Sequence, residues 1–155
     1  MNCVYSKSIP QSIKFLSDFS CNISPLSVVD GINFLCCTAI KYQLVLWDIF
    51  DGYIHTVVGF NDSGEITSIS HDQDFGIWVA TEKSIYYVSI NGQILAQIDL
   101  AEKISEIESV PMPSSTFERA AVCGTVSGKL YIITPRFDTK TIDSKELKGK
   151  HAHEI

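Results

Sequence analysis

The sequence has few basic residues and no long apolar segment. It contains 12 Lys and Arg residues against 18 Asp and Glu residues, which gives a formal net charge of −6. A nucleic-acid surface needs concentrated positive charge, so this balance argues against nucleic acid as a partner. No apolar run approaches the ~18 residues that a membrane-spanning helix requires. We therefore expect neither nucleic-acid binding nor direct insertion into a membrane.

The cysteines lack the spacing of a disulfide framework or a metal site. Their number is odd, and no Cys-x-x-Cys pair occurs among Cys3, Cys21, Cys36, Cys37 and Cys123. Cys36 and Cys37 lie within an apolar run, which is typical of buried thiols in a reducing compartment. Residues 1–10 have no apolar core long enough for a signal peptide. We expect reduced thiols and a cytoplasmic protein.

Motifs for catalysis or cofactor binding are also missing. The sequence has no phosphate-binding loop, no Gly-x-Gly-x-x-Gly and no nucleophile paired with a base. His71, Asp72 and Asp74 lie together, but in a predicted turn, where Asp and Gly are common because they allow the backbone conformation of a turn. His151 and His153 alternate along one segment without a third or fourth metal ligand. We expect no catalytic residue, no metal and no cofactor.

What the sequence does contain is an internal repeat. Thr38, Thr81 and Thr125 each end a short apolar run, and they are 43 and 44 residues apart. Each is followed by a second apolar run, at residues 44–47, 85–88 and 130–133. The dipeptide Glu-Ile recurs at 65–66, 106–107 and 154–155. A period in the mid-forties with four strands per unit is typical of the blades of a β-propeller.

Residues 64–100 show the repeating unit most clearly. Apolar runs at 65–71, 77–81, 84–90 and 93–98 predict four short antiparallel strands. Asn91-Gly92 is a strong two-residue hairpin signal, because both residue types tolerate a positive φ. A sheet with two apolar faces must stack on a neighbour. Equivalent units are expected at residues 23–60 and 104–148.

Both ends of the sequence fall within a unit. Residues 1–18 predict half a blade, and residues 151–155 begin another. Because propellers close with ~4–8 blades, three blades cannot form the ring. We expect the remaining blades to come from a longer chain, with association between separate chains as the alternative. The isolated chain is then not expected to be a well-behaved monomer, because its stacking faces are open.

The units resemble those of WD-repeat β-propellers. Residues 44–48, Leu-Val-Leu-Trp-Asp, are similar to the strand that ends in the family's Trp-Asp pair, and residues 146–151 are similar to its interblade loop. Trp-Asp occurs in the first unit only, Gly59-Phe60 replaces the usual Gly-His, and the family's Asp before the third strand is absent at Lys41 and Lys83. The full set of Asp, His, Ser or Thr and Trp is therefore not expected in any unit.

This resemblance implies an all-β fold, with about three four-stranded antiparallel blades of an incomplete WD-repeat-like β-propeller. Repeat positions are predicted to have structural roles. They are Thr38, Trp47, Asp48, Gly52, Thr81, Gly92, Thr125 and Gly128. The aromatic residues of the strands are expected to pack between blades, namely Trp47, Trp78, Tyr86, Tyr87 and Tyr131.

A narrower resemblance is to the C-terminal propeller of BEACH-domain proteins, which are large scaffolds of membrane traffic. It rests on residues 64–70, Gly-Glu-Ile-Thr-Ser-Ile-Ser, and on residues 88–96, whose Asn-Gly hairpin precedes a Leu-Ala strand. The resemblance implies a cytoplasmic location, peripheral to intracellular membranes.

Two functions remain from different classes. The first is a non-catalytic protein-interaction scaffold that binds protein partners through a rim or face. The alternative is an enzyme or ligand-binding propeller with a site in its central channel. A channel site needs matching polar groups on the first strands, and the corresponding positions hold only the small residues Ser24, Thr67 and Ser105. This favours the scaffold.

Overall fold

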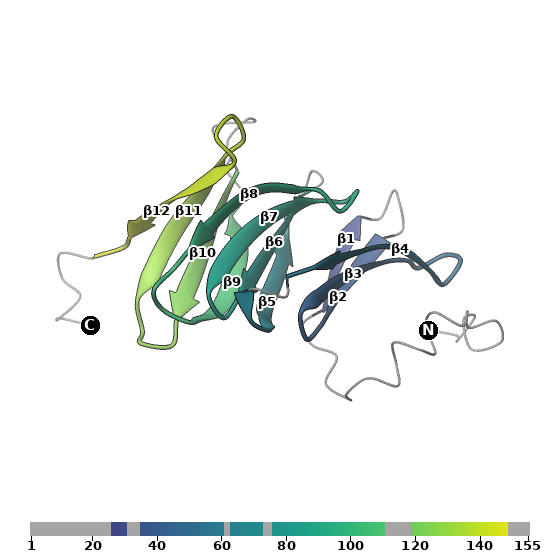
Figure 1. The fold of residues 1–155 in the computed structure, drawn as a ribbon, viewed down its shortest axis with the longest axis horizontal. Coiled ribbons are helices and arrows are strands. Elements are labelled where there is room, and N and C mark those ends of the chain that lie inside the picture. The colour runs from purple at the N-terminus through teal and green to yellow at the C-terminus, as the bar shows by residue number, and fades with distance from the viewer. Residues whose placement is uncertain (1–25, 31–34, 61–62, 73–75, 111–118, 149–155) are drawn as a thin grey trace.

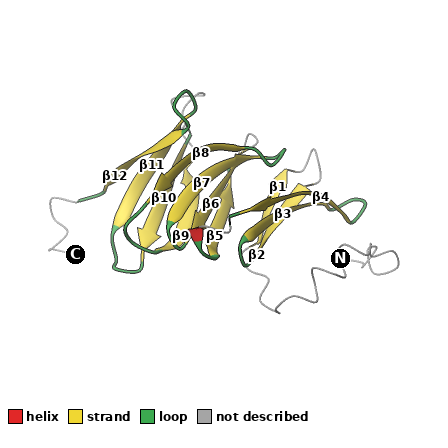
Figure 2. Cartoon of the chain, in the orientation of Figure 1, coloured by secondary structure: helices red, strands yellow, loops and turns green. Residues whose placement is uncertain are grey.

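The described chain is built from β-strands arranged in three groups of four. The computed structural model describes residues 26–30, 35–60, 63–72, 76–110 and 119–148, and this part contains no α-helix; the red segment in Figure 2 is a short 3₁₀ turn at Ser63 (Figures 1 and 2). Blade 1 comprises β1 (Leu26–Asp30), β2 (Leu35–Ile40), β3 (Gln43–Asp48) and β4 (Tyr53–Gly59). Blade 2 comprises β5 (Ile66–His71), β6 (Gly76–Thr81), β7 (Ser84–Ser89) and β8 (Ile94–Asp99). Blade 3 comprises β9 (Ile104–Val110), β10 (Ala120–Thr125), β11 (Leu130–Arg136) and β12 (Thr141–Glu146).

Within each blade, consecutive strands pair in the antiparallel direction. Blades 2 and 3 also meet at their outer strands, where Gln97 of β8 pairs with Thr141 of β12. This single parallel pair joins the two blades into one eight-stranded hydrogen-bonded sheet, while blade 1 forms a sheet of its own. The prediction of three four-stranded antiparallel units is confirmed.

Blade 2 is buried on both faces. All six residues of β6 are buried, as are the first five of β7. Neighbouring side chains in a strand point to opposite faces, so a strand covered on both sides needs an unbroken apolar run. Gly-Ile-Trp-Val-Ala-Thr and Ser-Ile-Tyr-Tyr-Val-Ser are such runs. Their sequences therefore require a blade on each side.

Two separate cores result from this alternation. The first lies between blades 1 and 2 and joins Cys37, Ala39, Leu44, Leu46 and Val58 to Ile66, Ile69, Ile77, Val79, Tyr86 and Val88. The second lies between blades 2 and 3 and joins Trp78, Ala80, Ile85, Tyr87 and Ala96 to Ile104, Ile107, Ala121, Cys123, Ile133 and Ile142. Adjacent residues such as Ile77 and Trp78 therefore pack in different blade interfaces.

Serine hydroxyls hold the first strands of blades 2 and 3 together. The backbone N–H of Ile107 donates to Ser68 Oγ at 3.1 Å, and that of Ser109 donates to Ser70 Oγ at 2.9 Å. Ser109 Oγ in turn donates to the carbonyl of His71 at 2.8 Å. The contact between β5 and β9 is therefore polar, and it supplements the apolar core beside it.

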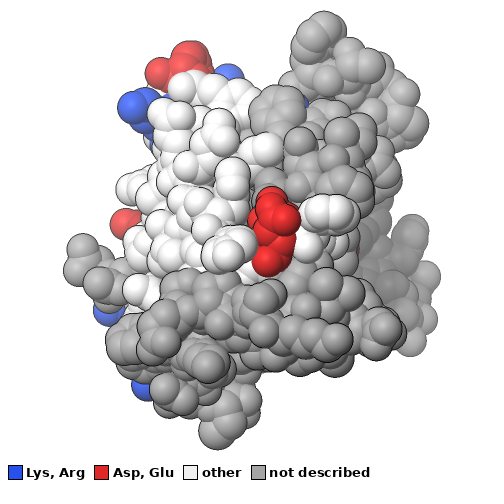
Figure 3. All heavy atoms as spheres, turned by 90° about the vertical axis from the view of Figure 1, so that its right-hand side faces the viewer, with Lys and Arg blue, Asp and Glu red and all other residues white. Residues whose placement is uncertain are grey.

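Trp47 does not lie between two described blades. It is partly buried against Ile40, Val45 and Ile54, and its Nε1–H donates to Thr38 Oγ1 at 2.9 Å. Leu44 and Leu46 face blade 2, so alternation turns Val45 and Trp47 to the opposite face of blade 1. The described surface at this end of the molecule carries few charged side chains (Figure 3).

The two tryptophans should contribute unequally to stability. Trp78→Ala is expected to lower the free energy of unfolding by about 3–5 kcal/mol. Trp78 is 0 % exposed and packs edge-on against Tyr87, with the ring centroids 4.7 Å apart. Trp47→Ala should cost about 1–2 kcal/mol, since a half-buried contact and one hydrogen bond are lost. Denaturant unfolding followed by circular dichroism measures both values. Equal losses would contradict the two-sided burial of blade 2.

Candidate functional site

The turns of the three blades lie on two opposite rims. The second and third strands of each blade are joined at residues 41–42, 82–83 and 126–129, and consecutive blades are joined near residues 63–65 and 100–103. Because the strands alternate in direction, all of these segments lie at the same ends of the sheets. We call this edge the connection rim. The turns at residues 49–52, 90–93 and 137–140 lie at the opposite edge.

Backbone hydrogen bonds recur along the connection rim. The first residue after the fourth strand of each blade donates its backbone N–H to a backbone carbonyl in the neighbouring turn or strand. The N···O distances are 2.7 or 2.8 Å. The pairs are Phe60 to Tyr42, Leu100 to Lys83 and Leu147 to Leu130. Ile66 also donates to the carbonyl of Lys41 at 2.7 Å, which ties blade 2 to blade 1. The rim therefore has a fixed backbone.

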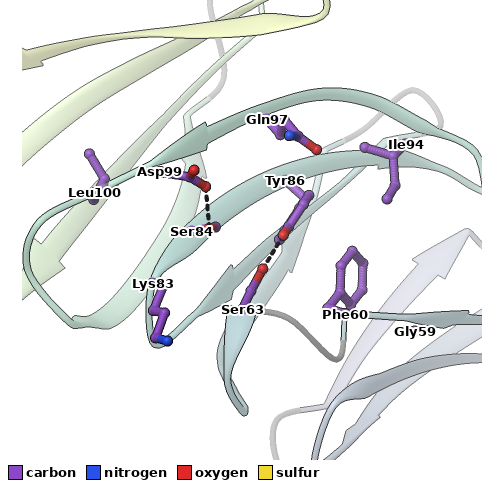
Figure 4. A pocket seen from close by; sticks show the side chains of 10 residues that line it. All are labelled: Gly59, Phe60, Ser63, Lys83, Ser84, Tyr86, Ile94, Gln97, Asp99 and Leu100. Carbon is purple, nitrogen blue, oxygen red and sulfur yellow. Dashed lines mark hydrogen bonds between the residues drawn. The ribbon is translucent and has the colours of Figure 1, made fainter.

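The larger of two cavities begins at this rim beside the end of β4 and runs along the outer strands of blade 2, from Leu100 towards Ile94 at the start of β8 (Figure 4). Its volume is ≈ 600 Å³. We call it the Phe60 groove (Figure 4), and it is lined by Gly59, Phe60, Ser63, Lys83, Ser84, Tyr86, Ile94, Gln97, Asp99 and Leu100.

The floor of the Phe60 groove is held by internal contacts. The rings of Phe60 and Tyr86 pack with their centroids 4.5 Å apart, and the hydroxyls of Ser63 and Tyr86 are hydrogen-bonded to each other. Ser84 Oγ donates to Asp99 Oδ1 at 2.6 Å. The groove therefore combines a rigid floor of packed aromatic rings with the exposed polar side chains of Lys83 and Gln97.

A second, smaller cavity of ≈ 190 Å³ lies at the next blade interface. We call it the Glu102 pocket, and its lining comprises Leu100, Ala101, Glu102, Thr125, Lys129 and Tyr131. Tyr131 packs on the core between blades 2 and 3 as Tyr86 packs on the core between blades 1 and 2. Leu100 lines both cavities, so they adjoin at this residue, and we call the two cavities together the rim groove.

The two carboxylate oxygens of Glu102 differ in their surroundings. Oε1 accepts a hydrogen bond from Ser127 Oγ at 2.6 Å and lies 3.8 Å from Lys129 Nζ. Oε2 is buried and has no hydrogen-bond partner. The Glu102 carboxylate is therefore held by Ser127 and Lys129 through Oε1, while Oε2 has no surface that is accessible from the cavity. No pattern in the sequence distinguishes Glu102 from other acidic residues.

The predicted channel positions on the first strands use their hydroxyls within their own blades. Thr67 Oγ1 donates to the carbonyl of Ala80 at 3.3 Å, and Ser105 Oγ donates to the carbonyl of Gly124 at 3.1 Å. Both residues occupy a bulge at the start of the strand. Ser24 lies outside the described residues. The two described positions therefore have structural partners.

The three repeated threonines fall into two structural classes. Thr81 and Thr125 end β6 and β10, and their Oγ1 atoms accept the backbone N–H of Ser84 at 3.0 Å and of Lys129 at 3.1 Å. Thr38 lies two residues before the end of β2 and accepts the Trp47 hydrogen bond instead. Ile40, rather than Thr38, occupies the strand position that corresponds to Thr81 and Thr125.

The other predicted repeat positions lie at turns. Asp48 Oδ1 accepts the backbone N–H of Phe50 at 2.9 Å and of Asp51 at 3.1 Å, so this side chain shapes the turn that contains Gly52. Gly92 has a φ of +87°, and a Cβ there would lie 2.9 Å from Thr56 Oγ1 of blade 1. A side chain at Gly92 would therefore be strained and crowded. Gly52 and Gly128 also have positive φ angles.

Asp72 connects blades 2 and 3. Its Oδ1 accepts the backbone N–H of Gly76 at 3.0 Å, and its Oδ2 accepts the hydroxyl of Tyr87 and lies 3.3 Å from Arg119 Nε. The Tyr87 side chain lies over Gly76, where any Cβ would meet the Tyr87 hydroxyl oxygen at 1.7 Å. Arg119 was not identified from the sequence. Asp74, His151 and His153 lie outside the described residues.

The described cysteines are thiols held in apolar surroundings. Cys36, Cys37 and Cys123 form no disulfide, while Cys3 and Cys21 lie outside the described residues. Burial raises the pKa of Cys36, and it raises the pKa of Cys123 to about 11. Because the thiolate is the nucleophile, the Cys123 thiol is protonated and unreactive at neutral pH.

The described residues hold neither a metal-binding cluster nor a membrane-spanning helix. Within residues 26–30, 35–60, 63–72, 76–110 and 119–148, no group of three or more His, Cys, Asp and Glu residues could hold a metal ion. The same part of the chain holds no helix with the length and apolar character needed to cross a membrane.

Comparison with known proteins identifies the fold. No family model and no curated protein sequence matches the chain. Among solved structures, it is similar to the β-propeller domain of Myceliophteria thermophila Cps50 (Swd1), with a TM-score of 0.68 and 11 % identity over 87 % of this chain. The WD40 domain of SCAP from fission yeast (TM-score 0.59, 12 % identity over 84 %) and Saccharomyces cerevisiae Sqt1 (0.59, 13 % over 86 %) are also similar.

These similarities confirm the predicted fold class. The chain has the fold of several blades of a WD40 β-propeller, and it covers 42 %, 34 % and 35 % of the three structures. It therefore spans less than half the length of each. At these identities the comparison concerns the fold alone.

Proposed function

We propose that this chain is a non-catalytic protein-interaction module that binds an extended segment of a partner protein along the rim groove. The observation that carries this proposal is that two cavities adjoin at Leu100. The Phe60 groove and the Glu102 pocket share Leu100 and cross two blade interfaces on one rim.

The surface of the rim groove has the composition of a peptide-binding site. Phe60, Ile94 and Leu100 provide an apolar wall, and Lys83, Gln97 and Asp99 provide exposed polar groups around it. Binding sites of this kind combine an apolar centre with a few placed polar groups. Exposed apolar side chains on the same rim extend the surface at either end, namely Tyr42, Val126 and Leu147.

The alternative of a catalytic or ligand-binding channel has less support. Thr67, Ser68, Ser70 and Ser105 face neighbouring backbone and are engaged in hydrogen bonds. Asp72 is engaged by the turn and by blade 3. These contacts use the groups that a channel site would need, so they favour binding at the rim over chemistry in a channel.

A peptide selection tests the proposed surface. We expect a phage-displayed library of random 12-residue peptides to yield binders to the 155-residue chain. Ile94→Asp should weaken their binding by at least about tenfold, because a charge in the apolar wall loses burial. Fluorescence polarisation with the selected peptides as synthetic probes measures the affinities.

Phe50→Asp provides a charge control for this selection, and the binding of Ile94→Asp is compared only if that variant melts cooperatively, because Ile94 also packs on the core between blades 1 and 2. Phe50 is 70 % exposed and lies on the opposite rim, so its substitution adds the same charge away from the groove. Peptides should bind this variant as they bind the original chain. Binding that survives Ile94→Asp but is lost in Phe50→Asp would contradict the proposed site.

We further propose that additional blades of a longer chain complete the propeller and that the whole protein is a BEACH-like scaffold of membrane traffic, located in the cytoplasm and peripheral to intracellular membranes. The first part is supported by the open face of blade 3, where Leu130 is 49 % exposed and Val122 and Ile132 are only partly buried. The second rests on the sequence resemblance of residues 64–70 and 88–96.

The coding sequence that adjoins residues 1–155 tests both parts. We expect it to encode further four-stranded units of about this length and a BEACH domain before them. Adjoining sequence without such units would contradict the first part, and adjoining units without a BEACH domain would contradict the second.

A further inference from the structure

We propose that the bound segment adds to blade 1 as a fifth β-strand, with its backbone paired to the outer edge of β4 and every second side chain in the Phe60 groove. This inference rests on the proposed function and adds the means of recognition, which is the backbone of an extended chain. It is carried by a difference between the blades. Among the described strands, β8 of blade 2 has a strand partner at its outer edge, whereas β4 of blade 1 has none.

A hydrogen bond at the end of β4 fixes which of its backbone groups point outward. The N–H of Phe60 donates to the carbonyl of Tyr42. The backbone groups of Phe60 and Val58 therefore point to β3, and those of the intervening residues Val57 and Gly59 point to the outer edge. Val57 is 44 % exposed, and Gly59 is exposed as well. Because glycine has no side chain, the surface that Gly59 offers to a ligand is its main chain.

Blade 2 shows that an outer edge of this kind accepts another strand. Leu100 corresponds to Phe60, since its N–H also donates to the neighbouring turn, so the backbone of Gln97 points outward as that of Val57 does. The N–H of Gln97 donates to the carbonyl of Lys140 in blade 3 at 3.2 Å. Val57 and Gln97 both lie three residues before the donor to the turn. The position that β12 occupies on blade 2 is thus open on blade 1 among the described residues.

The Phe60 groove lies beside the open edge of β4. It is lined by Gly59 at one end and extends along β8 towards Ile94 (Figure 4). The side chain of Val58 packs with Tyr86 and Ile94 in the core between blades 1 and 2. Side chains that lie next to each other on paired strands share a face of the sheet. The segment residue beside Val58 therefore enters the groove lined by Tyr86 and Ile94, and we expect this residue to be apolar.

The hairpin of residues 90–93 limits the length of the added strand. A Cβ at Gly92 would lie 2.9 Å from Thr56 Oγ1 and 3.3 Å from Val58 Cγ2, so this turn lies against β4. The open part of the edge then comprises Val57 and Gly59. It suits a paired stretch of about three to five residues, which spans roughly 10–17 Å in an extended chain.

An N-methyl scan of the peptides selected from the 12-residue library tests this inference. Each backbone N–H of a synthetic peptide is methylated in turn, and fluorescence polarisation measures its affinity for the 155-residue chain. In a β-strand only every second N–H points to a given neighbouring strand. Methylation should therefore weaken binding about tenfold or more at alternate residues of the paired stretch, and by less than about threefold at the residues between them.

A matched pair of proline variants tests the same edge from the side of the protein. Proline is tolerated on an edge strand where the missing N–H faces outward. Val57→Pro should weaken the peptides about tenfold or more, because it removes an outward N–H and places a ring at the edge. Ser144→Pro is the control. Ser144 is exposed in β12 and lies three residues before Leu147, whose N–H donates to Leu130, so its N–H also points outward. Peptides should bind Ser144→Pro as they bind the original chain.

The possible outcomes separate this inference from the proposed function. Sensitivity to N-methylation without alternation, or equal effects of Val57→Pro and Ser144→Pro, would overturn the inference, and the proposed function would still stand if Ile94→Asp weakens those peptides. A dimer of the chain that Val57→Pro dissociates would also overturn it, because the edge then pairs with a second copy. A library without binders would contradict both. If either proline variant fails to melt cooperatively, the N-methyl scan decides alone.

Discussion

The structure depends on the burial of blade 2 from both sides. In β6 and β7 every second side chain packs against blade 1 and the intervening ones pack against blade 3, so Ile77 and Val79 serve one core while Trp78 and Tyr87 serve the other. Neither core can form without the central sheet. Polar contacts then fix how the blades sit on each other, such as those of Ser70 with blade 3.

The rim groove follows from this stacking. The blades pack tightly where their strands are apolar, and cavities remain at the connection rim, where the chain passes from one blade to the next. Phe60 and Leu100 occupy corresponding places after β4 and β8, and each donates its backbone N–H to the turn beside it. Because both interfaces between described blades repeat this arrangement, the surface proposed for binding can extend across blades, with a local chemistry set by single residues such as Lys83 and Glu102.

Much of the fold could be predicted from the sequence, because local patterns encode it. The unbroken apolar runs around Trp78 and Tyr87 and the Asn91-Gly92 hairpin identified blade 2. The role of Thr38 could not be derived, since its spacing matches Thr81 although Ile40 holds the corresponding place. The candidate site could not be predicted either, because its lining comes from β4, β7, β8, β10 and β11 with the segments between them. The unsatisfied oxygen of Glu102 depends on packing that no sequence pattern reports.

Native-state hydrogen exchange tests the central claim most directly. If two-sided burial of blade 2 holds the molecule together, the hydrogen-bonded amides of β6 and β7 should exchange most slowly and only by global unfolding. Those of the outer strands β4 and β12 should exchange through smaller openings. Amides of β6 and β7 that exchange as fast as those of β4 or β12 would contradict the account.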